Sequence, residues 1–386
     1  MISLVIPTYN RPRFLGRLLL YYKQVKLPHK ITVADSSDPK NIDANAELVA
    51  DAKDVLEIDH LVYSSKAPFN AKLIQVLEAI DTKYAAFCGD DDFITLRGIE
   101  QATGYLEAHD DYSIASGRVS SVTAHSAAEG DLRYGLLSHR YAQRTIDDDN
   151  AAARLGNHLS NYSTTFYSVH RRAQLLRNMH LTLELTRDYR FGELLPSCLS
   201  LIQGKTICLE VLYMVRQAIT DSTAGKTDSW TDLLSQDDYS ERYALFSDCL
   251  IKELEDVTHL DQREAAEVVT QAFQAYLTSA VYRDLEANES AENGSTSRTE
   301  SYKQFLERLK RVVLILPAAA RASFIETQAL SMLKDPRSAY RQLQRRREEM
   351  SIDALLDKRS PFHDDFFPVY EYLGRYPDGI PFPANG

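Results

Sequence analysis

Short apolar runs and helix-like apolar stripes alternate along the first part of the chain. Apolar runs that predict strands occupy residues 2–6, 31–35 and 84–88, and residues 56–62 contain a further candidate strand. Between them, apolar side chains recur at intervals of three and four, as in Leu15, Leu18 and Leu19 after Pro12, which is the spacing of one helix face. Buried strands that alternate with helices are typical of βαβ units. The pattern therefore predicts an α/β fold, with a mostly parallel sheet flanked by helices.

Three of the predicted strands run directly into polar segments. These segments are residues 7–11 (PTYNR), 35–37 (DSS) and 89–92 (GDDD). In parallel α/β sheets, ligands bind beyond the carboxyl ends of the strands. We therefore expect the three segments to gather along one edge of the sheet and to form the functional site.

The second half of the chain is dominated by helical patterns. These patterns occupy residues 265–281, 301–315 and 322–357. Residues 287–299 are small and polar, which predicts a loop. We predict an α/β domain over residues 1–220 and an α-helical C-terminal domain or extension over residues 221–386.

The composition is that of an ordinary globular protein. Apolar residues make up 44% of the chain and charged residues 26%, which excludes a wholly disordered or collagen-like protein. The 44 Lys and Arg residues against 55 Asp and Glu residues give a net charge of −11. This acidic balance argues against a nucleic-acid partner, because such proteins usually carry positive charge that displaces counterions.

The sequence contains no pattern typical of a membrane span or a secretory leader. The longest apolar run is residues 312–320 and includes Pro317, whereas a spanning helix needs about 20 residues. The first residues enter an apolar strand without a basic leader. The four cysteines lack C-x-x-C spacing, which favours small buried side chains in a reducing compartment. We expect a cytoplasmic protein.

Three consecutive aspartates, Asp90, Asp91 and Asp92, follow the predicted strand at residues 84–88. Neighbouring carboxylates repel one another, so their presence needs an explanation. One interpretation is a solvated loop that precedes a helix beginning near Thr95. The other is a site for a divalent cation and a phosphorylated ligand, because magnesium and manganese prefer oxygen ligands.

These segments together resemble the inverting family 2 glycosyltransferases, which use nucleotide-sugar donors and have the GT-A fold. The resemblance rests on SLVIPTYNR at residues 3–11, VADSS at 33–37, NAK at 70–72 and FCGDDD at 87–92. It covers residues 1–125 well and 126–220 more loosely. It implies a Rossmann-like GT-A domain with a donor half over 1–125 and an acceptor half over 126–220.

The resemblance assigns expected roles to individual donor-site residues. Pro7, Thr8, Tyr9 and Arg11 would line the nucleotide pocket. Asp35 would hold the base, and Asn70 or Lys72 would lie near the ribose or the diphosphate. Arg216 would contact the diphosphate. Each of these residues alone also has an ordinary structural explanation as a surface charge, a turn residue or a packing residue.

The aspartates would hold the ribose and a metal ion, Mn2+ or Mg2+, in the place of the family's D-x-D element. Two frames fit that element. Asp90-Asp91-Asp92 matches it directly, whereas alignment on the following helix makes Gly89 the first position and Asp91 the metal ligand. We keep all three aspartates as site residues.

An inverting transfer needs a base for the acceptor hydroxyl. In the resembling family this is usually the second acid of a Glu-Asp pair, about eleven residues before a glycine that opens a strand. Glu193 stands at this distance from Gly204, but Gly192 replaces the first acid. Asp188 is the rival, and Glu193 could also be a solvent-facing acid. A histidine that often follows the Arg216 region is replaced by Ala218.

The resemblance implies a nucleotide-sugar donor, with a UDP-sugar favoured, and a sugar, a lipid-linked or a protein-linked acceptor. The C-terminal helices could shape the acceptor site, bind a partner or form a homo-oligomer. The basic stretch at residues 337–347 is explained by a solvated helix face or by attraction to the inner face of a membrane. We expect residues 363–365 (HDD) to begin a packed terminal segment.

Two other functions remain open from sequence. A sugar nucleotidyltransferase would share the sheet but should have a glycine-rich loop after the first strand, where this chain has residues 7–11. A non-catalytic relative that binds a nucleotide-sugar or a partner is the stronger alternative, because the base motif is degenerate.

Overall fold

The computed structural model describes residues 1–126, 132–135, 143–186, 188–217, 229–234, 236–293 and 352–381. Its centre is a mixed sheet in which the strands lie in the order β3-β2-β1-β4-β8-β6-β9-β5, with β7 paired to β6. The strands are β1 (Ile2–Thr8), β2 (Lys30–Asp35), β3 (Ile58–Val62), β4 (Tyr84–Phe87), β5 (Phe93–Ile94), β6 (Tyr112–Ser126), β7 (Leu132–Gly135), β8 (Val169–Arg171) and β9 (Lys205–Gln217).

The first four strands are parallel, as the sequence predicts. β1 pairs with β2 and β4, and β2 pairs with β3, all in parallel. β8 is antiparallel to both β4 and β6, while β6 and β9 are parallel over most of their length. Because the parallel strands all point the same way, the segments that follow β1, β2 and β4 emerge at one edge of the sheet.

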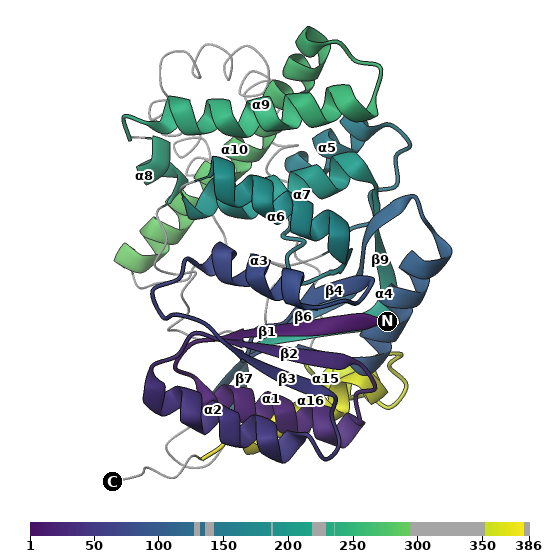
Figure 1. The fold of residues 1–386 in the computed structure, drawn as a ribbon, viewed down its shortest axis with the longest axis vertical. Helices are drawn as coiled ribbons and strands as arrows, with labels where there is room; N and C mark the ends of the chain where they lie inside the picture. The colour runs from purple at the N-terminus through teal and green to yellow at the C-terminus, as the bar shows by residue number, and fades with distance from the viewer. Residues whose placement is uncertain are drawn as a thin grey trace.

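Helices cover both faces of the sheet (Figure 1). One face carries α1 (Pro12–Val25), α2 (Pro39–Ala52), α4 (Leu96–Ala108), α15 (Ile352–Leu356) and α16 (His363–Arg375). Their apolar residues share one core with the sheet, and this core includes Leu18, Ile99 and Phe366. The other face carries α3 (Phe69–Ala79) and α6 (Arg172–Leu185), which form a second core with the sheet around Leu73 and Met179.

A third core joins helices from before and after residue 220. It contains α5 (Ala151–Ser160), α7 (Tyr189–Gln203), α8 (Trp230–Leu234), α9 (Tyr239–Val257) and α10 (Gln262–Asn293). Phe191 of α7 packs edge-on against Trp230 with 5.5 Å between ring centroids, and it packs against Phe246 at 5.0 Å. The division at residue 220 stays a prediction, and the described helices after it pack directly on the α/β part.

The predicted loop at residues 287–299 is wrong in its first part, because α10 continues through Asn293. This stretch alternates alanine and glutamate with small polar residues, and alanine and glutamate are good helix formers. The remainder of that loop, and the helical patterns from residue 301 to 351, lie outside the described residues.

Two other local predictions are confirmed, the helix start near Thr95 and the terminal segment that begins at His363. Thr95 caps α4 by accepting a hydrogen bond from the Gly98 amide at 3.0 Å, and His363 begins α16. The four cysteines are free thiols; Cys88 and Cys198 are buried, whereas Cys208 and Cys249 are half-buried.

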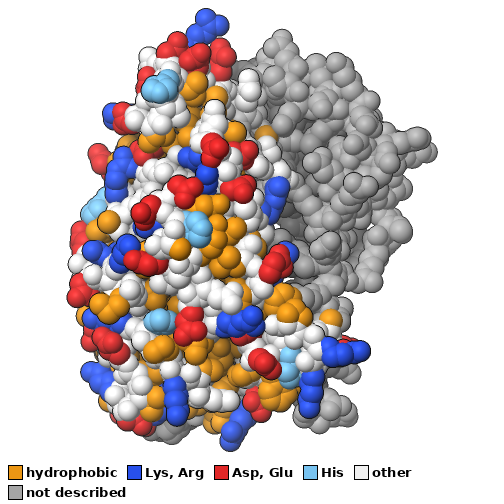
Figure 2. Space-filling model, turned by 90° about the vertical axis from the view of Figure 1, so that its right-hand side faces the viewer, with side chains coloured by type: hydrophobic (Ala, Val, Ile, Leu, Met, Phe, Trp, Pro, Cys, Tyr) orange, Lys and Arg blue, Asp and Glu red, His pale blue; other side chains and the backbone are white. Residues whose placement is uncertain are grey.

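None of the described helices is long and apolar enough to cross a membrane. Acidic, basic and hydrophobic side chains are interspersed on the described part of the surface in Figure 2.

Candidate active site

The segments after β1 and β4 meet at the carboxyl edge of the sheet, as expected. Thr8 Oγ1 donates a hydrogen bond to Asp90 Oδ2 at 2.7 Å. Arg11 Nη1 lies 2.9 Å from Asp90 Oδ1, and Arg11 Nη2 lies 2.8 Å from Asp91 Oδ2. Arg11 therefore joins two consecutive carboxylates of the predicted aspartate cluster.

The segment after β2 joins the same edge through Asn10. Asn10 has a φ of 56°, a left-handed conformation that asparagine tolerates better than most residues. Its backbone amide donates to Ser37 Oγ at 2.8 Å, and its Oδ1 accepts from the Asp38 amide at 2.9 Å. This turn fixes the two loops relative to one another.

The third aspartate is held by the end of β9. Arg216 Nε lies 3.2 Å from Asp92 Oδ2, and the Gln217 amide donates to Asp92 Oδ1 at 3.0 Å. The Arg216 guanidinium lies 4.7 Å from the centroid of the Tyr167 ring. Arg216, predicted to contact the diphosphate, thus reaches the aspartates predicted to hold the ribose and a metal ion.

The cluster is buried, which excludes the interpretation as a solvated loop. Asp90 is 3% exposed and Asp92 is 1% exposed. Burial raises the pKa of both carboxyl groups because the charged form is desolvated, and Asp91 adds to this, while Arg11 beside Asp90 and Arg216 beside Asp92 oppose it. Buried carboxyl groups whose pKa values are shifted in this way beside charged partners are typical of functional sites.

Arg17 is a part of the site that the sequence analysis missed. Its side chain leaves α1 and is fully buried. Nη2 donates to the backbone carbonyl of Asp91 at 2.9 Å, and the guanidinium lies 5.0 Å from the ring centroid of Phe93. Burial lowers the pKa of Arg17 to about 10, so it stays charged at neutral pH. In the sequence, the one feature that pointed to this residue was a lone arginine inside the apolar stripe of α1.

Asp35 is buried and its carboxylate is engaged by the protein. It accepts hydrogen bonds from the Ser37 amide at 2.8 Å and from Asn45 Nδ2 at 2.8 Å, and it lies 3.0 Å from His60 Nε2. Burial works against its charge, but these hydrogen bonds outweigh burial and lower its pKa. His60 and Asn45 were not predicted from sequence, and they orient the side chain expected to hold the base.

The remaining predicted donor residues differ in exposure. Lys72 is buried, donates from Nζ to Ser36 Oγ at 2.9 Å, and has a pKa that burial lowers. Pro7 is half-buried in β1, whereas Tyr9 is 52% exposed. Asn70 lies in the first turn of α3, where its Nδ2 would be 3.4 Å from a Cβ on Gly192. Asn70 therefore lies next to the start of α7.

The carboxylates leave a small space over Gly89. A Cβ on this glycine would lie 2.9 Å from Asp91 Oδ1 and 3.1 Å from Asp92 Oδ2, so any side chain would fill the space that both oxygens border. No group of three or more His, Cys, Asp or Glu side chains among the described residues is arranged to hold a metal ion. Two carboxylates together with substrate phosphates are nevertheless a common magnesium donor set. The residues therefore fit a divalent cation that the donor would help to bind.

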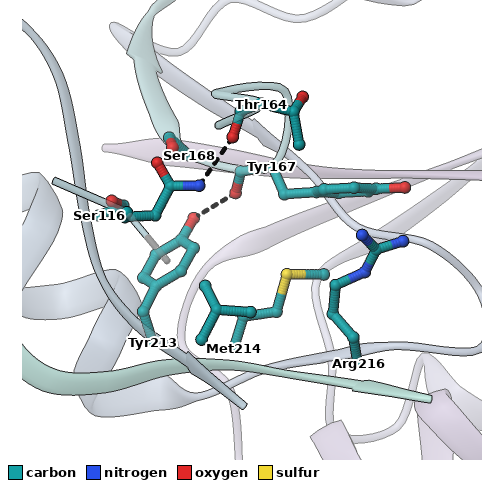
Figure 3. Close-up of a pocket in the computed structure, with 9 residues that line it drawn as sticks. Ser116, Thr164, Tyr167, Ser168, Tyr213, Met214 and Arg216 are labelled. Carbon is teal, nitrogen blue, oxygen red and sulfur yellow. Dashed lines mark hydrogen bonds between the residues drawn. The ribbon is translucent and has the colours of Figure 1, made fainter. Parts of the chain in front are cut away.

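A pocket opens beside Arg216. Its lining residues come from β6, β9, the loop before β8 and the segment before α5: Ser116, Val119, Gln143, Thr164, Tyr167, Ser168, Tyr213, Met214 and Arg216. Figure 3 shows the Tyr213 hydroxyl donating to the Tyr167 carbonyl, at 2.7 Å. It also shows Arg216 next to the Tyr167 ring. Arg216 thus borders the pocket and also contacts Asp92.

Glu193 lies near the pocket on α7, which begins at Tyr189. The Tyr162 hydroxyl donates to Glu193 Oε1 at 3.3 Å. Burial raises the pKa of Glu193, while Arg190, Thr164, Tyr162 and Arg216 act in the opposite direction. Thr164 and Arg216 also line the pocket, so Glu193 and the pocket share two neighbours, and its role as the base stays a prediction.

Asp188, the rival candidate base, lies at the start of α7. Its Oδ1 accepts from the Phe191 amide at 2.9 Å and caps α7, and its Oδ2 lies 3.6 Å from Arg242 Nη1. The choice between Glu193 and Asp188 as the base therefore stays a prediction.

The fold is found in known glycosyltransferases. TarS of S. aureus, residues 1–349 in complex with UDP-GlcNAc, matches with a TM-score of 0.52 at 13% identity over 83% of each chain. The same fragment in a second structure matches with a TM-score of 0.50 at 13% identity, over 89% of this chain and 92% of that one. The chain has the GT-A fold. A scan against protein-family models finds no match, and a search of the curated proteins by sequence finds none either.

A third structure is more distant. The mannosyltransferase PcManGT of Pyrobaculum calidifontis, in complex with GDP-Man and Mn2+, matches with a TM-score of 0.40 at 12% identity, over 89% of this chain and 84% of that one. A likeness at this level supports no argument about chemistry. Even for TarS the likeness extends to the GT-A fold alone.

Two features of the sequence lie outside the described residues, and two buried histidines lie within them. Ala218 and the basic stretch at residues 337–347 belong to the part that the structure does not describe. His158 and His170 are buried, and burial lowers the pKa of each to about 4. His158 hydrogen-bonds Ser197 and His170 hydrogen-bonds the Thr165 carbonyl, so both are neutral structural residues.

Proposed function

We propose that this chain is an inverting, metal-dependent glycosyltransferase of family 2 that moves a sugar from a nucleotide-sugar donor to an acceptor hydroxyl. The observation that carries the proposal is the buried cluster in which Asp90, Asp91 and Asp92 meet Arg11 and Arg216 at the carboxyl edge of the sheet. Such a cluster supplies both hard oxygen ligands and guanidinium groups that suit a diphosphate. The GT-A fold supports the same conclusion.

The donor diphosphate would bind where Arg11 and Arg216 now contact the aspartates. Both guanidiniums are charged at neutral pH and can form two parallel hydrogen bonds to phosphate oxygens. A divalent cation held by Asp91 and Asp92 would neutralise diphosphate charge and replace the charge that the arginines give up. The nucleoside would bind near Thr8 and the loop after Asp35. These residues lie at the paired ends of β1 and β2, and Thr8 contacts Asp90 of the cluster.

Glu193 would act as the base. Its carboxylate would accept the proton of the acceptor hydroxyl while that oxygen forms a bond to the anomeric carbon and the bond from this carbon to the diphosphate breaks. Arg11 and Arg216 would stabilise the negative charge that develops on the leaving diphosphate. One displacement without a covalent intermediate inverts the anomeric centre.

The substrate classes follow the same argument. A UDP-sugar is the favoured donor, because the TarS fragment of the same fold was solved with UDP-GlcNAc. The acceptor would be a sugar or a lipid-linked or protein-linked glycan, and the protein would act in the cytoplasm, at the inner face of a membrane when the acceptor is lipid-linked. We further propose that the helices after residue 220 serve the acceptor site or homo-oligomer contacts.

The alternative is a non-catalytic GT-A descendant that binds a nucleotide-sugar or a partner. It is favoured by one observation, the replacement of the first acid of the base motif by Gly192. Turnover separates the two functions, since a binding module would take up the donor without releasing nucleoside diphosphate.

The first experiment is thermal stability with UDP, GDP, dTDP and CMP, each with and without Mn2+. A ligand at about 100 times its dissociation constant adds roughly 2.7 kcal/mol of stability, so one nucleotide should raise Tm in a manganese-dependent manner. That nucleotide names the donor class, and its sugar derivative is then used for turnover. If no nucleotide raises Tm, the donor site is not functional and the proposal is wrong.

A further inference from the structure

The residues that follow α16 return to the N-terminal turn of α1. The Ile380 amide donates to the Arg13 carbonyl at 3.0 Å, and Arg13 Nε donates to the Ile380 carbonyl at 3.1 Å. Gly379 has a φ of +79°, and a Cβ there would lie 2.6 Å from both the carbonyl carbon and the carbonyl oxygen of Arg13. Only glycine allows this approach without displacing backbone. We call residues 376–380 the docked segment.

One carbonyl of the docked segment connects two residues that hold the aspartate cluster. The Pro377 carbonyl accepts from Arg17 Nη1 at 3.3 Å and from Gln217 Nε2 at 2.7 Å. Arg17 Nη2 in turn donates to the Asp91 carbonyl at 2.9 Å, and the Gln217 amide donates to Asp92 Oδ1 at 3.0 Å. The Pro377 carbonyl is therefore linked to Asp91 through Arg17 and to Asp92 through Gln217.

These contacts are shielded from water. Arg17 is fully buried and Gln217 is 8% exposed, and the Tyr376 carbonyl gives Arg17 Nη1 a further acceptor at 3.0 Å. A buried guanidinium that loses its acceptors must find others or move. Beyond the docked segment, Arg17 also contacts the Asp91 carbonyl, so undocking would draw Arg17 toward Asp91 and change the geometry that the diphosphate meets.

We propose that the docked segment is a positioning element of the diphosphate site: it fixes Arg17 and Gln217, and through them Asp91 and Asp92. The inference rests on the proposed function of the cluster as a donor diphosphate site. It predicts that undocking the segment weakens diphosphate binding while nucleoside binding, which uses the Thr8 and Asp35 side of the edge, is retained.

The test variant is Gly379→Ala. The added methyl group would clash with the Arg13 backbone, and the variant changes no residue of the cluster itself. Its matched control is Gly104→Ala on α4, where a Cβ would meet nothing within 4 Å. Dissociation constants are measured by calorimetry with Mn2+ for UDP and UMP, or for the GDP or dTDP pair if that base binds the wild-type chain. Gly379→Ala should bind the diphosphate about tenfold more weakly, equivalent to roughly 1.4 kcal/mol, and the monophosphate within about twofold of wild type.

A second variant, Gln217→Leu, removes the side-chain hydrogen bond to Pro377 and keeps the backbone amide that binds Asp92. It should lower diphosphate affinity in the same selective way. If both variants bind the diphosphate as the wild type does, or if both ligands weaken equally, the segment has no positioning role and the proposal is overturned.

Hydrogen exchange of the peptide that covers residues 88–95 separates this proposal from the donor-site function. Gly379→Ala should increase exchange at the cluster loop, and Gly104→Ala should not. This measurement needs no nucleotide. If the wild-type chain bound no nucleotide, the donor site would be refuted. Increased exchange in Gly379→Ala would still support positioning by the docked segment. Unchanged exchange in Gly379→Ala would overturn it.

Discussion

Arg11 and Asp91 face each other at the carboxyl edge of the sheet, with 2.8 Å between Nη2 and Oδ2. The Arg11 side chain is 31% exposed and the Asp91 side chain 16% exposed, whereas the Asp90 side chain, which Arg11 also contacts, is 4% exposed. Arg11 therefore reaches from the surface into a buried cluster of carboxylates. It is the cation of the cluster that an incoming diphosphate can engage first.

Arg11→Gln should weaken nucleoside diphosphate binding by roughly ten- to a hundredfold, because charge-assisted hydrogen bonds to phosphate are lost. It should also lower Tm, since Asp90 keeps its burial and loses its ion pair. Calorimetry and thermal unfolding measure the two effects. Arg263→Gln is the control. The Arg263 side chain is 88% exposed and pairs with Glu267 one helical turn away on α10. Equal affinities in Arg11→Gln and wild type would contradict the donor-site role.

Asp91→Asn and Asp92→Asn test the metal. Both carboxylate groups border the space over Gly89, and an amide is a much weaker ligand for a hard cation than a carboxylate. At least one variant should bind the diphosphate equally well with and without Mn2+, whereas the wild type should bind it more tightly with Mn2+. Asp54→Asn, at a side chain that is 66% exposed beside Lys23, is the control. If both variants keep the manganese effect, the metal assignment is wrong.

Glu193→Gln should reduce turnover by about 10²–10⁴-fold and leave donor affinity unchanged, because the amide cannot accept the acceptor's proton. Burial raises the pKa of Glu193, and the base must be ionised to work. Turnover should therefore fall as pH decreases, with its midpoint above the ordinary glutamate value of about 4.3. Initial rates across pH 4–8 measure this.

Asp188→Asn separates the two candidate bases. Asparagine caps a helix as well as aspartate does, so the variant keeps the contact with the Phe191 amide and removes only the carboxylate. We expect turnover within about twofold of wild type. A large loss in Asp188→Asn together with an active Glu193→Gln would reverse the assignment.

The sequence predicted the strand-end segments because local periodicity and chain direction determine them. Once residues 2–6, 31–35 and 84–88 are read as parallel strands, Thr8, Asp35 and Asp90 must emerge at one edge. Glu193 came from the family resemblance instead, as the acid eleven positions before a glycine, and the structure has it on α7, which ends at Gln203 before β9. The strand-end segments depend on short stretches of sequence and on one topological rule.

Arg17 and Pro377 could not be predicted in this way. Arg17 meets the Asp91 carbonyl 74 positions away and the Tyr376 carbonyl 359 positions away. Both partners are backbone groups, which carry no residue signature. The neighbours of Asp35, His60 and Asn45, were missed for a related reason: their pairing depends on the side-by-side register of β2 and β3 and on the packing of α2.

The buried histidines give the protein a sensitivity to acid that is independent of catalysis. Burial lowers the pKa of His158 and of His170 to about 4, while an unfolded histidine titrates near 6.5. The unfolded chain therefore binds more protons than the folded chain in this window, so the stability is complete above about pH 6.5 and is lost as pH falls toward 4. Each histidine should contribute a slope of about 1.4 kcal/mol per pH unit.

His158→Gln tests this slope. The glutamine amide can still hydrogen-bond Ser197, which lies 2.7 Å from His158 Nε2, but it does not titrate. The free energy of unfolding in urea, measured from pH 4.5 to 7.5, should therefore change less steeply with pH in this variant, by about one proton's worth. The matched control variant is His180→Gln on α6, where the side chain is 52% exposed. Parallel curves for His158→Gln and wild type would mean that His158 is protonated to the same extent in both states, and that burial does not hold it neutral.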